Sequence, residues 1–135
     1  MTQEDKELLF KDLSARLPYG VKGIITYDKS NTTFTVEGID NNVLHLSYAE
    51  DCYVEDFKPY LRPLSSMTDE EREEYRKFSY YGAAGVRPYT HGDFVAVPSF
   101  EKMDWLNAHH FDYRGLIEKG LALEAPEGMY NIKEK

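Results

Sequence analysis

The sequence is poor in cysteine and in long apolar runs. Cys52 is the only cysteine among 135 residues, which excludes an intrachain disulfide and favours a reducing compartment. No apolar run approaches the about 18 to 20 residues that a membrane helix requires. The first residues, MTQEDKELLFKDL, carry acidic side chains where a secretory signal peptide has basic ones. We therefore expect a cytoplasmic protein that does not enter a membrane.

Positive charge is also scarce, because 24 Asp and Glu residues outnumber 16 Lys and Arg residues. The net charge of −8 opposes contact with phosphate backbones, where affinity depends on Lys and Arg, so we do not expect direct nucleic-acid binding. The chain does contain 41% hydrophobic residues, with 11 Tyr, 7 Phe and 1 Trp, which predicts a packed core. Its length fits a single domain over residues 1–135.

The N-terminal half predicts a helix followed by a sheet. Thr2 can cap a helix over 1–18, in which leucines recur at helical spacing. Residues 21–62 are rich in β-branched and aromatic residues, interrupted by turn residues such as the pair Asn41 and Asn42. This pattern predicts a small antiparallel sheet of about four strands, of the SH3-like kind.

The C-terminal half predicts further helices. Thr68 and Glu71 form the S/T-x-x-E capping box of a helix over 66–79. The remaining segments are a loop over 80–98, a helix pair over 99–123, whose second helix Asp112 caps, and a tail over 124–135. The predicted fold class is therefore α+β, with the small antiparallel SH3-like sheet flanked by about four helices.

His109 and His110 form the densest cluster of reactive side chains. Adjacent residues on a helix point about 100° apart, so these two cannot bind one metal ion as an i,i+4 pair does. They are interpreted as the end of a helix, where His contacts free carbonyl groups. The alternative brings one of them to His91 and Asp93 as a two-His, one-carboxylate set, which predicts a metal-assisted hydrolase.

Two other patterns also favour structural interpretations. The acidic neighbours of Cys52 raise the pKa of a thiol, so this residue is interpreted as part of the core and not as a nucleophile. The glycine-rich stretch Gly82–Gly85 lacks the lysine and the strand-to-helix context of a phosphate loop. Arg87 and His91 leave open an anion pocket beside it. No cofactor is expected.

Two sets of side chains predict a contact surface. They are Tyr80, Tyr81 and Tyr89 in the predicted loop, and Lys58, Tyr60 and Arg62, which alternate along one face of an extended strand. Tyrosine is enriched where proteins contact partners, although these rings can also cover the loop's own small core. The strand is either a binding edge or only the exit from the sheet.

Three segments, ARLPYGVKG, KPYLRPLSSMTDEEREEY and DWLNAHHFDYRGLIEKGLALEAP, carry a resemblance. Their amino-acid sequences resemble those of a group of short proteins of gut anaerobic bacteria and their prophages or mobile elements. This group has no assigned catalytic residue. The resemblance implies an accessory or regulatory protein. We therefore predict a non-enzymatic protein-interaction module with an unidentified protein partner. The alternatives are the metal-assisted hydrolase and an acidic decoy that inhibits a nucleic-acid-binding protein.

Overall fold

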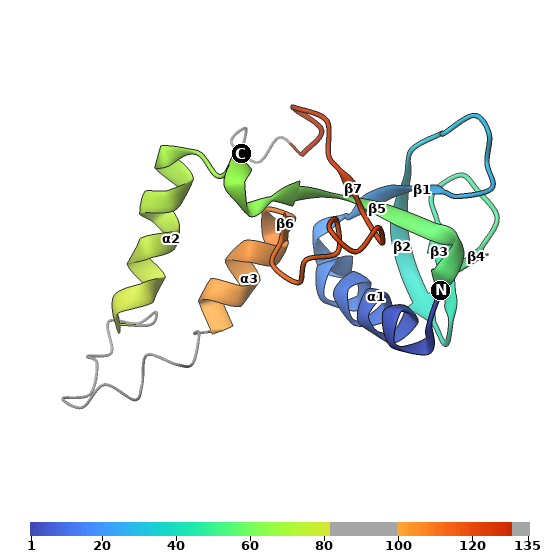
Figure 1. The fold of residues 1–135 in the computed structure, drawn as a ribbon, viewed down its shortest axis with the longest axis horizontal. Coiled ribbons are helices and arrows are strands. Elements are labelled where there is room, and N and C mark those ends of the chain that lie inside the picture. The colour runs from blue at the N-terminus through green and yellow to red at the C-terminus, as the bar shows by residue number, and fades with distance from the viewer. Residues whose placement is uncertain (82–99, 131–135) are drawn as a thin grey trace.

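A computed structural model describes residues 1–81 and 100–130 of the chain. Within them lie three α-helices, α1 (Gln3–Arg16), α2 (Asp69–Tyr81) and α3 (Phe100–Ala108). The strands there are β1 (Lys22–Ile25), β2 (Phe34–Asp40), β3 (Val43–Leu46), β4 (Cys52–Tyr53), β5 (Phe57–Pro63), β6 (Phe111–Asp112) and β7 (Leu123–Glu124). Short 3-10 turns are η1 (Leu17–Tyr19), η2 (Val54–Asp56) and η3 (Leu64–Ser66). In Figure 1, α2 and α3 lie side by side at the opposite end of the molecule from β2, β3 and β4.

The strands in the described ranges form one mixed sheet of seven strands, in the order β4-β3-β2-β1-β5-β6, with β7 also paired to β5. Neighbours from β4 to β5 are antiparallel, whereas β6 and β7 run parallel to β5. The prediction of a four-stranded antiparallel SH3-like sheet flanked by about four helices is therefore wrong. The parallel strands come from residues 111–124, which were expected to form a helix and the start of a tail.

Strand β5 is an inner strand and not the open edge that was considered for Lys58, Tyr60 and Arg62. Lys58 pairs with β1, Tyr60 with β7 and Arg62 with β6, so both sides of β5 are hydrogen-bonded. At Gly23 of β1, an added Cβ atom would overlap the Lys58 carbonyl oxygen and the Phe57 ring of β5. Only glycine fits there without displacing a neighbour.

Two hydrophobic clusters hold the fold together. The larger joins α1 to the sheet and to the segment between β6 and β7, through Leu9, Leu13, Val21, Val36, Leu44, Phe57, Leu61, Leu116 and Leu121. The smaller lies beneath α2 and α3 and contains Met67, Trp105, Leu106 and Phe111. Phe111 on β6 therefore packs below the helix pair, while the residues after it pack against α1.

The helix caps and the turn that the sequence predicted from local signals are confirmed. The Thr2 hydroxyl accepts the Asp5 amide at 3.0 Å, as expected for the cap of α1. The Thr68 hydroxyl accepts the Glu71 amide at 3.1 Å, and the Glu71 carboxylate accepts the Thr68 amide at 2.9 Å. Asn41 turns the chain between β2 and β3 at a φ of 58°, a conformation that asparagine adopts more readily than most residues.

Residues 112–122 do not form the predicted second helix of the 99–123 pair. Asp112 does accept backbone amides, at 2.9 Å from both Leu116 and Ile117, but these belong to a turn and not to the first turn of a helix. Gly115 and Gly120 both have positive φ, which a helix interior excludes. The chain therefore curls back and returns to the sheet as β7.

Other predicted boundaries also shift. Helix α2 continues through Tyr80 and Tyr81, which were expected in the loop over 80–98. The predicted tail over 124–135 begins inside β7, and its Tyr130 packs into the fold. The rest of the predicted loop, from 82 to 98, lies outside the described residues, as do 131–135. Among the helices that are described, none has the length and apolar character needed to cross a bilayer.

Candidate functional site

A cleft of about 460 Å³ opens where β5 ends. One wall comes from the end of β5 and the start of α2, and the other comes from the segment after β7. Its lining includes Arg62, Ser66, Glu71, Glu124, Pro126 and Tyr130. A concave surface of this size, with both charged and apolar walls, is the kind of site in which proteins hold a ligand or a partner's side chains.

Arg62 and Glu71 form the rigid floor of the cleft. The guanidinium donates two hydrogen bonds to the two Glu71 oxygens, at 2.9 and 2.8 Å, and lies 4.2 Å above the centre of the Phe111 ring. Burial alone raises the pKa of the Glu71 carboxyl, but the hydrogen bonds from Arg62 and Thr68 outweigh it and lower that pKa overall. The Arg62 charge is thus neutralised by Glu71, so Arg62 does not make this cleft an anion site.

Tyr130 fixes the other wall of the cleft. Its hydroxyl accepts the Lys22 amide at 2.8 Å and lies 2.9 Å from the Tyr60 carbonyl oxygen, to which it donates. It therefore joins β1 to β5 one residue beyond their last backbone pair. Burial raises the pKa of the Tyr130 phenol, so it stays protonated. Lys58 and Tyr60 are half-buried on the same strand, and Tyr60 contacts the Tyr130 hydroxyl through its backbone carbonyl.

The two adjacent histidines have separate structural contacts. His109 follows α3, and its Nδ1 donates to the Trp105 carbonyl at 2.9 Å while its ring stacks on the Trp105 indole. His110 is 1% exposed; its Nε2 donates to the Tyr19 carbonyl at 3.1 Å, and its ring stacks on Tyr130. Burial above all, together with the Arg16 charge, lowers the pKa of His110 to about 3. Both histidines follow the end of α3, as interpreted, but the Trp105 carbonyl that the His109 ring contacts is not free, because it also accepts the His109 amide at 3.0 Å.

The candidates around residue 90 lie outside the described residues. They are Arg87, Tyr89, His91 and Asp93. Residues 1–81 and 100–130 contain no group of three His, Cys, Asp or Glu side chains placed to hold a metal ion.

No family model, no curated protein and no solved structure matches this chain. The chemistry of the site therefore depends on the geometry of its own residues.

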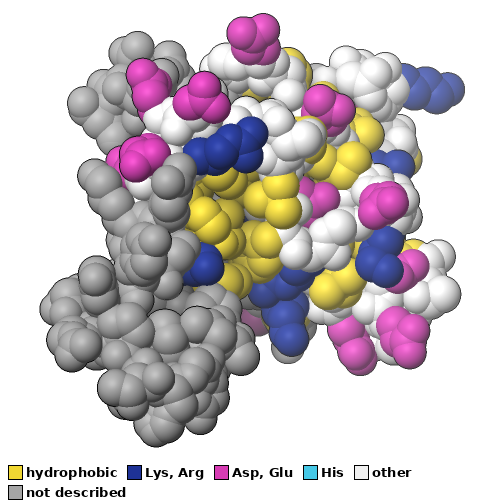
Figure 2. All heavy atoms as spheres, turned by 60° about the vertical axis from the view of Figure 1, so that its left-hand side comes forward, with side chains coloured by type: hydrophobic (Ala, Val, Ile, Leu, Met, Phe, Trp, Pro, Cys, Tyr) yellow, Lys and Arg dark blue, Asp and Glu magenta, His cyan; other side chains and the backbone are white. Residues whose placement is uncertain are grey.

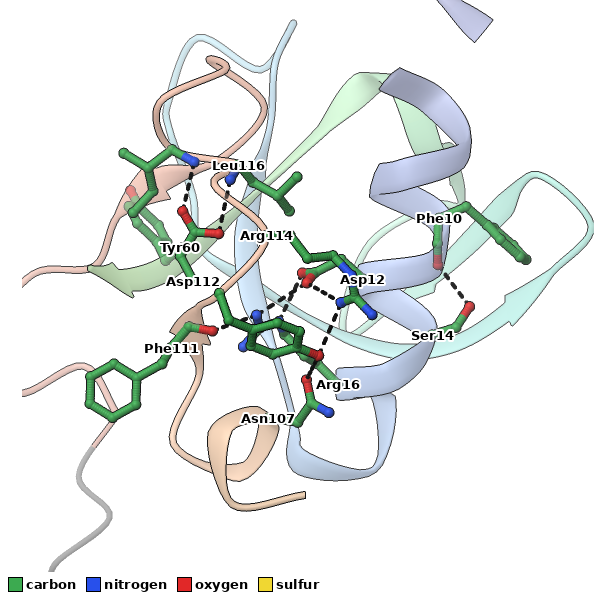
Figure 3. A network of polar contacts seen from close by, with 12 residues as sticks. Phe10, Asp12, Ser14, Arg16, Tyr60, Asn107, Phe111, Asp112, Arg114 and Leu116 are labelled. Atoms are coloured by element: carbon green, nitrogen blue, oxygen red, sulfur yellow. Dashed lines mark hydrogen bonds and ion pairs between the residues drawn. The ribbon is translucent and has the colours of Figure 1, made fainter. Parts of the chain in front are cut away.

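A buried polar network, which the sequence reasoning missed, is linked to the site through Phe111, whose ring lies under Arg62 (Figure 3). Asp12 and Arg16 of α1 are both 0% exposed and are joined by hydrogen bonds of 2.8 and 3.1 Å. Arg114 donates to the same carboxylate at 2.7 Å and to the Tyr113 hydroxyl at 3.0 Å. Arg16 also donates to the Phe111 carbonyl at 2.6 Å, so the network ties α1 to β6.

This network has a structural role. A carboxylate that is fully enclosed and shared by two guanidinium groups cannot reach a substrate. The hydroxyl of Tyr113 donates in turn to the Asn107 side chain at 2.7 Å, which extends the network to α3. The one signal available in the sequence was the i,i+4 spacing of Asp12 and Arg16, which more often marks a solvated helix face.

Cysteine and tyrosine chemistry is concentrated at the other end of the sheet. Cys52 is 5% exposed, as expected for a core residue, and burial and nearby acids raise its pKa to about 11. Around it lie Tyr27 and Tyr53, which are 66% and 56% exposed, and Tyr48 is fully exposed. The sequence predicted contact tyrosines at Tyr60, Tyr80, Tyr81 and Tyr89, and not at these positions. Tyr27 is followed by Asp28 and Tyr48 is preceded by Ser47, both turn residues, whereas Tyr53 lies between Cys52 and Val54 and carries no such signal.

Proposed function

We propose that this protein is a non-enzymatic protein-interaction module that receives part of a partner in the cleft beside Arg62. The observation that supports this most is the construction of the cleft. Its walls are fixed by the Arg62–Glu71 pair and by Tyr130, so the surface is preorganised before any partner arrives. Leu64, which is 44% exposed beside it, offers an apolar contact at the edge.

The condition of the reactive side chains also favours binding over catalysis. His109 and His110 each use one ring nitrogen in a hydrogen bond to a backbone carbonyl, and the His110 ring is enclosed. Cys52 has a raised pKa, which opposes the thiolate that a nucleophile requires. Tyr80, Tyr81 and Tyr89, near the end of α2 and beyond it, remain part of the proposed contact surface, together with Lys58 and Tyr60.

The resemblance to short proteins of gut anaerobes and their prophages supports an accessory or regulatory role in the cytoplasm. The acidic decoy is the less favoured alternative, because such a decoy needs a continuous acidic stripe. On the face in Figure 2, acidic side chains stand apart from one another around an apolar patch, and Lys and Arg side chains border that patch. A surface of this kind fits contact with a protein better than mimicry of a nucleic acid.

A tryptophan placed in the cleft tests the proposal. Ser66 lines the cleft, whereas Ser65 is an exposed neighbour on the same short turn that does not line it. Partners captured from a bacterial extract by the wild-type chain and by Ser65→Trp should be lost from Ser66→Trp. Alanine at Tyr81 and Tyr89 tests the remaining surface. If every captured protein is retained by all of these variants, this surface is not the interface.

The enzyme alternative has its own readout. Hydrolysis of a simple phosphate or ester substrate that requires added zinc, and that is lost on changing His91 to Ala, supports the metal-assisted hydrolase instead. The Ser66→Trp variant leaves that activity intact if the catalytic site is elsewhere. The two functions are therefore distinguished by which variant abolishes which signal.

A further inference from the structure

A second concave surface lies beside β4, at the end of the sheet away from the Arg62 cleft. It is a groove of about 330 Å³ lined by Tyr27, Val43, Asp51, Cys52, Tyr53 and Asp56. Tyr27 follows β1, and the Thr26 amide beside it donates to the Asp56 carbonyl at 2.8 Å. This bond holds the turn after β1 against η2, so both sides of the groove belong to the folded sheet.

The two tyrosines at this groove are exposed to an unusual degree. Tyr27 and Tyr53 leave 66% and 56% of their surface in water, although a tyrosine side chain gains free energy by burial. Tyr53 lies on β4, whose other residue, Cys52, points into the core. The alternation along this strand therefore presents the Tyr53 ring on the outside.

The groove is also negatively charged. No Lys or Arg is among its lining residues, and the Asp56 carboxylate makes no hydrogen bond or ion pair within the described part of the chain. Among the residues that the structure places, Asp51 has only the His45 ring as a partner, at 3.0 Å, in a pair that is about half exposed. Burial, followed by the charges of the same two carboxylates, raises the pKa of Cys52 on the groove floor.

We propose that this groove binds an arginine or lysine side chain of a partner protein, with the cation against Tyr27 and Tyr53 and paired to Asp56. Cations bind the faces of aromatic rings, and a carboxylate beside the rings adds a charge-assisted hydrogen bond. A neutral or acidic partner would leave the Asp56 charge without a counterion at the interface, which the net charge of −8 makes more costly. The inference goes beyond the proposed function, because it concerns a different surface from the Arg62 cleft.

Titration with a minimal peptide, followed by NMR of the isotope-labelled full chain, tests this inference. The probe is a blocked nonapeptide with one central arginine among Gly and Ser residues, and the reference is the same peptide with citrulline, which keeps the shape and removes the charge. Saturable shifts are expected at Tyr27, Tyr53 and Asp56 with arginine, and binding to the citrulline peptide should be at least threefold weaker. Each of Tyr27→Leu and Asp56→Asn should weaken arginine binding about three- to fivefold.

Matched variants separate a specific groove from general attraction to an acidic protein. Glu37→Gln removes one exposed negative charge on β2, and Tyr48→Leu removes one exposed tyrosine outside the groove, so both should bind the arginine peptide as the wild type does. Equal weakening by Glu37→Gln and Asp56→Asn would overturn the inference, as would shifts spread over all acidic surfaces. Ser66→Trp, which blocks the other cleft, should leave peptide binding unchanged, so the two proposals fail separately.

Discussion

Replacing His110 with Asn is expected to remove most of the acid sensitivity of folding between pH 7 and pH 5. The His110 ring is enclosed between the Tyr19 carbonyl and the Tyr130 ring, and its Nδ1 has no hydrogen-bond partner among the described residues. Protonation would place a charge there, close to Arg16, His109 and Lys22, and no acidic group among the described residues compensates it. Asn suits the site because the backbone φ of 61° is one that asparagine tolerates.

The magnitude follows from the two pKa values. The pKa of His110 is about 3 in the folded protein, whereas histidine in an unfolded chain has a pKa of about 6.5. Because the folded value is the lower one, the unfolded state binds the proton first, and stability falls as the pH drops through 6.5 toward 3. Linkage then gives a loss of about 2 kcal/mol between pH 7 and pH 5, and of about 5 kcal/mol once the pH is below both values.

Urea unfolding at a series of pH values measures this loss. Trp105 is the only tryptophan and is 9% exposed, so its fluorescence reports unfolding. The free energy of unfolding of the wild type should fall by about 2 kcal/mol from pH 7 to pH 5, whereas that of His110→Asn should change by less than about 0.5 kcal/mol. His45→Asn, at a half-exposed site, serves as the control and should behave as the wild type. Parallel pH slopes for wild type and His110→Asn would refute the reasoning.

Three further substitutions and one measurement of thiol reactivity test other parts of the structure. Asp12→Ala removes the carboxylate shared by two guanidinium groups and should lower the free energy of unfolding by about 3–5 kcal/mol, measured by urea titration at pH 7. Gly23→Ala should cost about 1–3 kcal/mol by the same measurement, because its methyl group meets the Phe57 ring; an unchanged midpoint would show that the strands can separate. Thr68→Ala should cost about 1 kcal/mol through loss of the α2 cap, and Ser65→Ala beside it should cost nothing measurable. Cys52, with a pKa of about 11, should react with a disulfide reagent at pH 8 at least about a hundredfold more slowly than free cysteine, until urea exposes it.

The parts of the fold that sequence predicted correctly are those decided within a few residues. The Thr2 cap, the capping box at Thr68 and the turn at Asn41 each depend on a side chain and backbone three or fewer positions apart. The presence of strands between residues 21 and 62 follows from alternation along single strands, whereas the size and the mixed arrangement of the sheet do not. Arg62 was among the predicted contact residues. Its partner Glu71 was interpreted only as part of a helix cap, because no local sequence pattern shows that one carboxylate serves both roles.

The parallel strands were beyond prediction for a different reason. β6 and β7 have two residues each, too few to show any periodicity, and their places are fixed by partners on β5. Asp112 and the turn that follows it carry the same signals as a helix start, namely an acidic cap followed by apolar residues. Only Gly115, three positions after the cap, argued against a helix, and its positive φ stops one from forming.

The enclosed Asp12 carboxylate determines whether the segment around β6 forms a helix or docks on α1 as part of the sheet. Arg16 satisfies it from the same helix, but Arg114 must come from a position 102 residues away, and Arg16 must also reach the Phe111 carbonyl. An enclosed ion pair contributes little unless its remaining hydrogen bonds are made, so α1 alone gains little from burying these groups. The segment around β6 therefore has to dock on α1 for the network to stabilise either one. That requirement places Arg62, paired with Phe111 on β6, at the cleft we propose as the interface, and it explains why neither half of the chain reveals the site by itself.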